Sequence, residues 1–591
     1  MTIAPIEAAG IGAAVPGGLR GVGYTGQVEL LGRLGRRVAD AASTYGSLSD
    51  DDVLHGFRKQ AGLRAPGSPM TGWAAETSQM TFGQWVSGLA RLGATLQDRS
   101  LTNKAVALLH GYGQTLPTDG TTGMNIYAWE KLICGLADAI DYCGDTDAPA
   151  LLVKIARAER FDRTRATAIA SDFSGQEPHF SIEWYTLSEN LYKGARLTGN
   201  GDLAQLAAQW HYDAYWDRFR EAPAPGTRWR IPPWLHAYSH VNTFASAAAA
   251  YEANGDQGLL AVLRNAFAWL TTTQVFATGG FGPHEFTMPE DGTLGRCLEW
   301  LTDSAEIVCG SWALFKLITA LLKHTGDARY LDLAERLVYN GIGATIPVRP
   351  DGRSPYYADY RLGVATKLPY WHAWPCCSGT YLQAVAHLHD LVYFSADDGV
   401  AVGLYVPSRF SWDQEDVRVT MSQDTVFPAA EDTRLRLTMA APIAFKLHLR
   451  VPAWSRFEAR VNDRPVEMAP RPDQWVTIDR RWESGDTVTV RLGPRLRAES
   501  VDEFHPNRAA VMFGPVVLVQ DVDWHTPFDV PVPWQMLDWE SHLARESDEL
   551  VFVPTQPGTH RMPPGGFRPF YELPERAPYR MYHDFGSRRI I

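Results

Sequence analysis

Two adjacent cysteines, Cys376 and Cys377, stand between an aromatic-rich stretch, YWHAW, and a segment with helical spacing, GTYLQAVAHLHDL. Neighbouring thiols do not easily form a disulfide with each other, but their thiolates can bind one soft divalent ion, with Zn–S distances of about 2.3 Å. Metal binding deprotonates a thiol, and the thiolate is the nucleophilic form of cysteine. The pair therefore predicts a metal-binding or nucleophilic centre, and packing as two small apolar side chains is the competing interpretation.

The segments that must position this pair read as a long series of helices. From about residue 27 to 395, apolar residues recur at spacings of three and four, as in QVELLGRLGRRVADAASTY and EIVCGSWALFKLITALLKHTGD. Many segments end in Gly-Asp or Gly-Asn, which is typical of a helix C-cap followed by a turn. Repeated helical hairpins over this length predict an (α/α)6 barrel. An α-solenoid is the competing all-α fold, although the sequence has no fixed repeat period.

The period of the apolar residues changes from 3.6 to 2 after about residue 395. Segments such as DVRVTMSQ, FKLHLRVP and DTVTVRLG alternate apolar and polar residues and are separated by turn signals. We therefore predict a multidomain α + β protein, with an (α/α)6-barrel catalytic domain over 1–395 and an antiparallel β-sandwich domain over 396–500. Residues 501–591 are expected to form a second small β-sandwich or an irregular C-terminal region that wraps around the rest.

The composition is that of a globular protein with an acidic balance. Apolar residues make up 45% and charged residues 21% of the chain, and the net charge of −12 argues against a nucleic-acid or anionic-membrane partner. The 20 tryptophans suit a protein that stacks aromatic rings on sugars, and they equally suit large packed cores. We expect a small-molecule or oligosaccharide substrate, and a homo-oligomer stays open.

The N-terminal sequence, MTIAPIEAAGIGAAVPGG, has no basic region and its apolar stretch is broken by Pro and Gly, so we expect no signal peptide. No run of about 18 apolar residues appears, so we expect no membrane span. Six cysteines in a chain without an export signal predict a cytoplasmic protein, where disulfides are disfavoured.

Several short blocks follow one another in an order that resembles a known enzyme family. They are TGWAAE, EKLICGLADA, EWYTLSENLY, HVNT, GGFGPHEF, CCSGTY and, in the strand-rich part, RVPAWS, VND and GDTVTVRL. Over about residues 50 to 520 the chain resembles the bacterial β-L-arabinofuranosidases of glycoside hydrolase family 127. The resemblance implies a catalytic (α/α)6 barrel with β-sandwich domains. It also implies a retaining hydrolase with a cysteine thiolate nucleophile, held in a cysteine-rich zinc site, and a glutamate acid/base.

The resemblance assigns roles to three of the cysteines. Cys376 matches the nucleophile, and Cys377 would be a supporting zinc ligand. Cys309, in DSAEIVCGSW, matches the upstream cysteine ligand of the family.

The chain departs from the family pattern beside Cys309. The family motif has Glu two residues before this cysteine, and here that position is Ile307. Glu306 stands three residues before Cys309, so the two would share a face if the segment is already helical, and Asp303 is another candidate. We expect a Zn²⁺ cofactor held by Cys309, Cys376, Cys377 and Glu306.

Glu285, in GGFGPHEF, matches the general acid/base of the family. A general acid must stay protonated near neutral pH, which requires burial or a nearby negative charge. The stretch from Glu285 to Cys309 is longer than the family's usual spacing and contains an extra cysteine, Cys297. Cys297 is an alternative ligand, with packing in the core as its more ordinary role.

The remaining candidates are residues of a sugar pocket. His240, in HVNT, matches a family histidine that lines the pocket, and His236 and Tyr238 lie within about one helical turn of it. Glu183 is a candidate acceptor for a sugar hydroxyl, whereas Glu189 would pair with a nearby Lys or Arg. Weaker candidates are Trp73, Glu76, Trp371 and His372.

Three functions compete on this evidence. The first is a retaining exo-glycoside hydrolase that releases a small furanose, most simply β-L-arabinofuranose, through Cys376 and Glu285. The second is a polysaccharide lyase, because such enzymes also combine helical toroids with β-sandwiches and use Tyr and His as base and acid; Tyr238 and His240 would take those roles. The third is a diverged sugar-binding member, or one acting on an unusual furanoside, which Ile307 keeps open.

Overall fold

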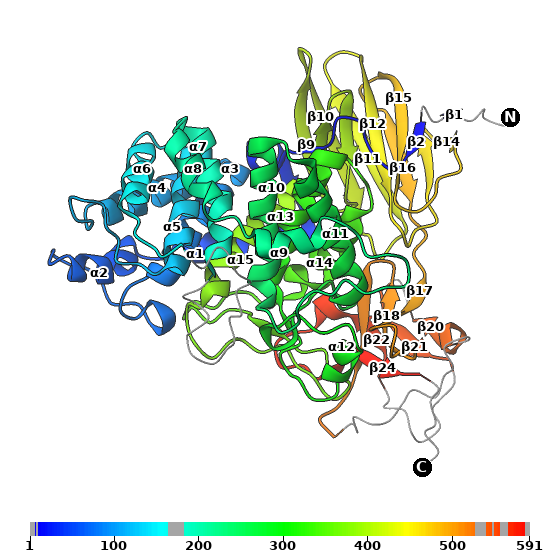
Figure 1. Cartoon of the computed structure of the whole chain (residues 1–591). Helices are drawn as coiled ribbons and strands as arrows, with labels where there is room; N and C mark the ends of the chain where they lie inside the picture. Colours follow the sequence, from blue (N-terminus) through cyan, green and yellow to red (C-terminus); the bar gives the residue numbers. More distant parts are fainter. Residues whose placement is uncertain are drawn as a thin grey trace.

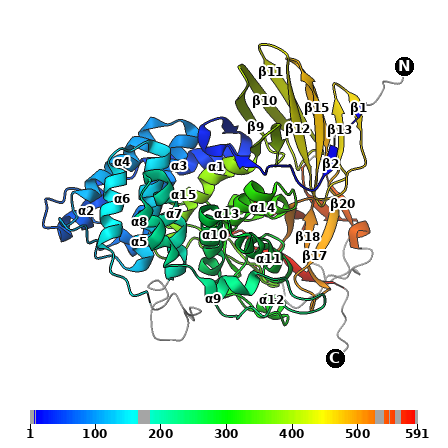
Figure 2. The ribbon, with the colours of Figure 1, turned by 45° about the horizontal axis from the view of Figure 1, so that its top comes forward.

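The computed structural model describes residues 6–7, 10–163, 183–525, 539–546, 549–555 and 565–585. It contains a toroid of helices, a β-sandwich and a C-terminal sheet (Figure 1). The sandwich and the C-terminal sheet lie together on one flank of the toroid, which a second view confirms (Figure 2). The predicted architecture, an (α/α)6 barrel followed by β-rich domains, is confirmed.

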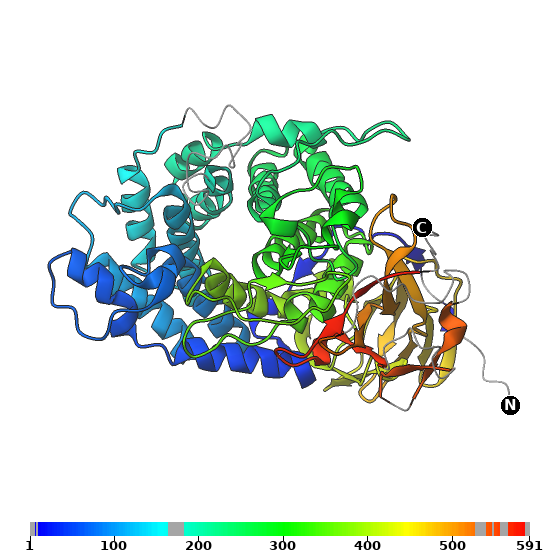
Figure 3. The same cartoon turned by 90° about the horizontal axis from the view of Figure 1, so that it is seen from below.

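Six inner helices form a closed ring, and Figure 3 views the toroid from its end. Each helix contacts the next one around the ring, and the last contacts the first. The second and the last of these helices, Ile126–Asp138 and Cys376–His387, are buried along their whole length, as expected for helices inside a large core. In ring order they are α3 (Gln79–Leu96), α5 (Ile126–Asp138), α7 (Leu187–Thr198), α10 (Ala237–Asn254), α13 (Ile307–Thr325) and α15 (Cys376–His387).

An outer helix packs against each inner helix. The outer helices are α4 (Arg99–Gly113), α6 (Ala148–Ala158), α8 (Gly201–Ala208), α11 (Gln257–Thr273), α14 (Tyr330–Asn340) and α1 (Gly32–Gly46), which pairs with α15. Short helices α2 (Asp50–Gln60), α9 (Asp213–Trp216) and α12 (Thr293–Cys297) lie in the connections. Because inner and outer helices alternate along the chain, the inner helices run in the same direction, and their N-terminal ends meet at one mouth of the toroid.

One of the described helices, α13, is long and apolar enough to cross a membrane by length and composition, and 72% of that stretch is buried inside the protein. This burial fits its place as an inner helix of the barrel, since core helices of large proteins are apolar on all sides.

Two sheets face each other in the β-sandwich. Phe410 of one sheet stacks on Tyr393 of the other, and Trp412 packs edge-on against Phe445. In order across the first sheet, the strands are β1 (Ile6–Glu7), β14 (Arg464–Glu467), β13 (Glu458–Val461), β16 (Thr487–Arg491), β11 (Asp432–Met439), β10 (Val417–Thr425), β9 (Ser408–Gln414) and β4 (Val28–Leu30). Across the second they are β2 (Gly10–Gly12), β15 (Gln474–Trp482), β12 (Ile443–Val451), β8 (Gly399–Val402), β7 (Tyr393–Ala396) and β3 (Arg20–Gly21).

The N-terminal strands differ from the expected assignment of residues 1–395 to the barrel. Strands β1 to β4 pair with strands of the sandwich, so these described N-terminal strands belong to the sandwich and precede the helices of the toroid. Their short length, two or three residues each, explains why no alternating pattern marks them in the sequence.

A buried arginine joins the sandwich to the toroid. Arg450 of β12 donates to Asp332 and Glu335 of α14 at 2.6 and 2.7 Å, and Trp454 Nε1 donates to the same Glu335 at 2.8 Å. The Arg450 side chain is fully buried, so the two carboxylates supply the charge compensation that a buried guanidinium requires.

The described part of the C-terminal region forms one sheet rather than a second sandwich. Its strands are β17 (Leu496–Ser500), β18 (Arg508–Phe513), β19 (Val516–Asp521), β22 (Phe567–Pro569), β21 (Phe552–Pro554) and β20 (Leu543–Arg545), with β23 (Tyr579–Arg580) beside β19 and β24 (Tyr582–Asp584) beside β18. The sheet packs on the loops at the toroid mouth: Tyr579 Oη donates to the Asp359 carbonyl at 2.6 Å, and Lys367 Nζ donates to the carbonyls of Phe570 and Leu573.

Candidate active site

The predicted site residues come from the N-terminal ends of the inner helices. Cys376 is the first residue of α15, and Cys309 is the third residue of α13. His236 immediately precedes α10, and Glu183 lies on the short turn before α7. Residues more than 190 positions apart along the chain therefore meet at one mouth of the ring.

Three thiols and one carboxylate converge at this mouth. Cys309 Sγ lies 3.2 Å from Cys377 Sγ and 3.9 Å from Cys376 Sγ. Glu306 Oε1 lies 3.4 Å from Cys377 Sγ and 3.8 Å from Cys376 Sγ. All four side chains are buried, and their ligand atoms lie within 4.8 Å of one another. Of the two interpretations of the cysteine pair, simple packing does not account for a carboxylate buried among the sulfurs.

The spacing of these atoms fits a tetrahedral metal ion. A Zn–S distance of about 2.3 Å places two sulfurs of a tetrahedron about 3.8 Å apart, and a sulfur and an oxygen about 3.5 Å apart. The two sulfur–sulfur separations, 3.2 and 3.9 Å, and the two sulfur–oxygen separations, 3.4 and 3.8 Å, lie on either side of these values. Among the described residues, the second carboxylate oxygen, Glu306 Oε2, is buried without a hydrogen-bond partner, which is costly unless a cation compensates its charge. Three sulfurs and one oxygen are also a donor set that zinc accepts.

Glu306 reaches the thiols in a different way from the one the sequence suggested. It does not share a helical face with Cys309, because it is the N-cap of α13, with φ −78° and ψ 85°, and belongs to a two-residue strand, β5 (Ala305–Glu306). Strand β5 pairs with β6 (Tyr357–Ala358), which sets Glu306 opposite Tyr357. Glu306 stands one residue farther from Cys309 than the family glutamate does, and it still reaches the thiols because the chain changes from strand to helix between the two residues.

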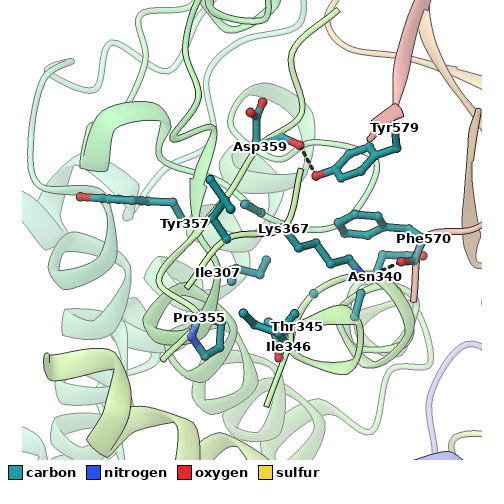
Figure 4. Close-up of a pocket in the computed structure, with 14 residues that line it drawn as sticks. Ile307, Asn340, Thr345, Ile346, Pro355, Tyr357, Asp359, Lys367, Phe570 and Tyr579 are labelled. Carbon is teal, nitrogen blue, oxygen red and sulfur yellow. Dashed lines mark hydrogen bonds between the residues drawn. The ribbon is translucent and has the colours of Figure 1, made fainter. Parts of the chain in front are cut away.

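Ile307 and Asp303 lie elsewhere. Ile307 lines a small pocket of ≈ 20 Å³ on the opposite side of β6, beside Lys367 and Phe570, where Tyr357 turns its hydroxyl away (Figure 4). Asp303 accepts from His284 Nδ1 at 2.6 Å and is not part of the thiol group. Of Asp303, Glu306 and Ile307, Glu306 is the one whose carboxylate lies among the thiols.

Hydrogen bonds shift the pKa values of the three thiols in different directions. Burial by itself raises the pKa of Cys376, but hydrogen bonds from Cys309, Cys377 and the Tyr356 hydroxyl, 3.6 Å away, lower it well below the ordinary value. Burial raises the pKa of Cys309 and of Cys377. These hydrogen bonds therefore favour the thiolate of Cys376 over those of Cys309 and Cys377, and the thiolate is the nucleophilic form of cysteine.

Glu285 lies on a strained turn. It has a φ of +65°, directly after His284 with a φ of +52°, and such conformations cost energy for residues with a side chain. His284 is held there by Asp303, whose carbonyl accepts from the His284 backbone N–H at 2.9 Å. The Tyr357 hydroxyl donates to Glu285 Oε1, and His236 Nε2 lies 3.4 Å from Glu285 Oε2.

Tyr356 and Tyr357 join the two halves of the site, and the sequence analysis missed both. Tyr356 contacts the Cys376 sulfur while its neighbour Tyr357 contacts the Glu285 carboxylate, and their ring centroids are 4.5 Å apart. Burial and the Glu285 charge raise the pKa of Tyr357, so it remains a hydrogen-bond donor. A tyrosine doublet in the loop sequence SPYYADY, 20 residues before Cys376, was the available signal.

His236 lies between two carboxylates. Its Nδ1 is 3.3 Å from Glu183 Oε1 and 2.7 Å from Ser239 Oγ, while its Nε2 faces Glu285. Burial lowers the pKa of His236, but the Glu285 hydrogen bond and the charges of Glu183 and Glu306 outweigh it and raise the pKa to about 10. Protonated His236 therefore holds Glu183 and Glu285 in place, and its Nε2 proton can pass to Glu285, which must carry a proton to act as a general acid.

His240 lies behind the layer formed by His236, Glu183 and Glu285. It is fully buried, its Nδ1 lies 2.9 Å from the His236 carbonyl and its Nε2 lies 3.1 Å from Tyr212 Oη. Burial lowers its pKa to about 3, so it is neutral. The structure does not place His240 in position to touch a sugar; it packs behind the helix turn that carries His236.

The other candidates are spread over the mouth. Tyr238 is buried near His236, with ring centroids 6.1 Å apart. Trp73 lies on a short turn whose backbone N–H donates to Ala373, just before the cysteine pair. Glu76 is exposed, and Cys297 packs against Met288, with the two sulfurs 3.8 Å apart.

Glu130 and Lys131 are further buried charges that the sequence analysis did not select. Lys131 Nζ lies 3.8 Å from the centroid of the Tyr127 ring and 3.4 Å from Glu130 Oε2. Asn190 Nδ2 donates to the other Glu130 oxygen at 2.8 Å. Burial lowers the pKa of Lys131, but Glu130, Glu183 and Cys376 raise it overall, so a second cation faces the thiols.

A wide cavity of ≈ 850 Å³ lies toward the C-terminal ends of the inner helices, at the other end of the ring. Its wall carries ion pairs, including the predicted pairing of the half-buried Glu189 with a lysine, Lys316. It contains none of the residues predicted for catalysis, so we place the active site at the opposite mouth.

Comparisons with known proteins identify the family of the chain. A family model described as the catalytic domain of GH127 β-L-arabinofuranosidase matches residues 27–390, and one described as the GH127 middle domain matches residues 399–493. No curated protein matches the sequence.

Solved structures show the same fold. A GH127 β-L-arabinofuranosidase from Geobacillus stearothermophilus T6 superposes with a TM-score of 0.71 at 18% identity, covering 95% of this chain and 100% of that one. A second GH127 β-arabinofuranosidase gives a TM-score of 0.70 at 18% identity, covering 97% and 98%. Because the catalytic family model covers more than half of the 591 residues, this chain belongs to glycoside hydrolase family 127, the β-L-arabinofuranosidase family, and is a glycoside hydrolase.

Proposed function

We propose that the enzyme is a retaining exo-hydrolase that releases β-L-arabinofuranose, or a closely related furanose, with Cys376 as nucleophile and Glu285 as acid/base. The observation that carries the proposal is the Tyr356–Tyr357 pair. It ties a thiol of lowered pKa to a carboxyl group on a strained turn, so that the two groups face one site. Retaining glycosidases need such a pair close together, because the nucleophile attacks the anomeric carbon while the acid protonates the leaving oxygen.

In the first half-reaction, Cys376 Sγ forms a bond to the anomeric carbon as the bond to the aglycone oxygen breaks. Glu285 gives its proton to that oxygen, and the aglycone leaves as an alcohol. His236 and Tyr357 hold Glu285 at the position from which it can protonate the aglycone, and Tyr356 holds the attacking sulfur.

In the second half-reaction, Glu285 takes a proton from a water molecule. The water oxygen bonds to the anomeric carbon, and the carbon–sulfur bond breaks, which restores the thiolate of Cys376 and the proton of Glu285. Two displacements at the same carbon retain its configuration. Glu183, held by His236, is a candidate acceptor for a sugar hydroxyl.

Glu306, Cys309, Cys376 and Cys377 are the residues that would hold the Zn²⁺ that the family implies. When bound, the ion would supply positive charge that keeps cysteine sulfur in the thiolate form. Cys309, Cys377 and Glu306 also surround Cys376 directly, and Thr380 Oγ1, 3.2 Å from Cys309 Sγ, supports the group from α15.

We expect the purified enzyme to bind about one zinc ion per chain. Cys309→Ala and Glu306→Ala should each lose most of this zinc and lower the melting temperature, because each removes a ligand from a buried group. Elemental analysis and thermal unfolding measure both effects. Cys143→Ala, a half-buried thiol outside the group, is the matched control. Full zinc occupancy in the Cys309→Ala, Glu306→Ala double variant would contradict the assignment.

The function is tested with 4-nitrophenyl β-L-arabinofuranoside and its α-anomer. We expect release of nitrophenol from the β-anomer only, and proton NMR at early times should show β-configured arabinose before it equilibrates in water. If the first product has the α configuration, the retaining mechanism is wrong, and if neither compound is cleaved, the substrate is wrong.

The lyase alternative has no support in the geometry. A lyase needs a tyrosine that ionises easily, but burial raises the pKa of Tyr238 well above its ordinary value. Its proposed partner, His240, is fully buried behind Tyr185 and Tyr212. An absorbance assay for an unsaturated product is expected to show none.

A further inference from the structure

A ladder of aromatic rings leads from the nucleophile to the surface. Tyr356, whose hydroxyl contacts Cys376, stacks on Tyr370 with ring centroids 4.5 Å apart and planes 28° apart. Tyr370 stacks in turn on Trp371, at 4.8 Å and 29°. Among the large apolar side chains of the described residues, Trp371 is the most exposed, at 72%. A single exposed aromatic residue needs no functional explanation by itself, but this one continues a stack of rings that begins at the Cys376 sulfur.

The ladder lies on the side of the site from which the aglycone leaves. Glu285, which protonates the leaving oxygen in the proposed mechanism, is hydrogen-bonded to Tyr357, and the Tyr357 ring meets Tyr370 edge-on with centroids 6.2 Å apart. A furanose bound at Cys376 would therefore have its aglycone directed toward Tyr370 and Trp371.

The backbone on both sides of Trp371 is fixed. The Tyr370 N–H donates to the Ser354 carbonyl at 2.9 Å, and the Trp374 N–H donates to the Gly352 carbonyl at 2.8 Å. Trp374 has a φ of +52°, is buried, and packs edge-on against Trp85 at 5.4 Å. Its ring occupies the space that a side chain at Gly352 would need.

A second contact secures the loop from the other side. The Trp73 N–H donates to the Ala373 carbonyl at 3.1 Å, and Gly72, with a φ of +61°, approaches Ala373 so closely that a Cβ would lie 2.1 Å from its carbonyl oxygen. Trp371 is thus exposed on a loop that is ordered before any ligand binds. Preorganisation of this kind lowers the entropy cost of stacking.

We propose that Trp371, backed by Tyr370, is a specificity-determining platform for a second sugar ring, the aglycone of an arabinofuranosyl disaccharide or oligosaccharide. The proposal rests on the proposed function, because it places the aglycone relative to Cys376 and Glu285. The flat C–H face of a sugar ring covers an indole ring well, whereas a methyl aglycone is too small to reach it. The platform therefore selects substrates by the aglycone and leaves the chemistry of the first sugar unchanged.

The test compares two substrates: a β-L-arabinofuranosyl disaccharide and methyl β-L-arabinofuranoside. Trp371→Ala should raise KM for the disaccharide and lower its kcat/KM about tenfold, as expected for the loss of one aromatic stacking contact. For the methyl glycoside, kcat/KM should change less than about twofold. Trp371→Phe should restore part of the disaccharide activity, because the smaller ring still stacks.

The matched control is Trp524→Ala, which removes a tryptophan that is 64% exposed in the C-terminal region and should leave both substrates unaffected. An equal loss on both substrates, or no loss on either, would overturn the platform while leaving the proposed function intact. If the unmodified enzyme cleaves neither substrate, the proposed function fails, independently of Trp371.

Discussion

Replacing Cys376 with alanine is expected to lower kcat for 4-nitrophenyl β-L-arabinofuranoside on the order of 10⁴-fold, because no other group can form the covalent bond to the anomeric carbon. The fold should survive, since Cys376 is only one of many buried residues in the core cluster of the barrel, and circular dichroism checks this. Cys143→Ala should keep full activity and serves as the cysteine control.

Loss of activity alone does not separate a nucleophile from a metal ligand, since Cys376 is proposed as both. Azide separates the two roles. In Cys376→Ala, azide can enter the space left by the sulfur and attack the anomeric carbon once, which gives a glycosyl azide of inverted configuration. Cys377→Ala should lose zinc as well, but azide should not rescue it by this route. If Cys377→Ala and not Cys376→Ala gives the glycosyl azide of inverted configuration, Cys377 is the nucleophile and Cys376 the supporting ligand.

The fold could be predicted from the sequence because its signals are long and local. The inner helices are 12 to 19 residues long, and several end in a glycine with positive φ, as α7 does at Gly199, α10 at Gly255 and α13 at Gly326. The change of period near residue 395 marked the sandwich. The strands before residue 31 escaped prediction because pairs of two or three residues carry no periodicity and depend on partners more than 370 residues away.

Some residues of the site could be predicted from the sequence and others could not, because only some are marked by residue type or local spacing. Cys309, Cys376 and Cys377 stand out by residue type, so their convergence could be expected from a resemblance. Glu306 was selected by helical spacing, and its real position depends on the pairing of β5 with β6, which no local pattern indicates. Tyr357 belongs to β6 and Tyr356 directly precedes it, so both were missed together with this strand pair. Conversely, His240 looked functional by type but is held in an aromatic cage behind the site.

The largest remaining effect is expected at Glu285, and it should depend on the leaving group. Glu285→Gln removes the proton that the aglycone oxygen needs, so hydrolysis of the disaccharide should fall about 10²- to 10⁴-fold. Nitrophenolate leaves without such help, so the first half-reaction of the 4-nitrophenyl glycoside should be far less affected. Because the same substitution removes the base of the second half-reaction, this substrate should give a burst of nitrophenol and then stall.

The stalled reaction of Glu285→Gln allows the nucleophile to be identified directly. Mass spectrometry of the variant mixed with the 4-nitrophenyl glycoside should find one arabinosyl unit on the peptide that carries Cys376, and azide should release it as a glycosyl azide of retained configuration, opposite to the product from Cys376→Ala. Glu76→Gln, at an exposed carboxylate of the same mouth, should behave like the unmodified enzyme. If Glu285→Gln slows both substrates by the same factor and no adduct forms, Glu285 positions the substrate and another group donates the proton. If the adduct forms on Cys376, Glu285 and Cys376 are the two reacting groups of one two-step displacement. The strained turn then places the proton donor, and the lowered pKa of Cys376 supplies the nucleophile.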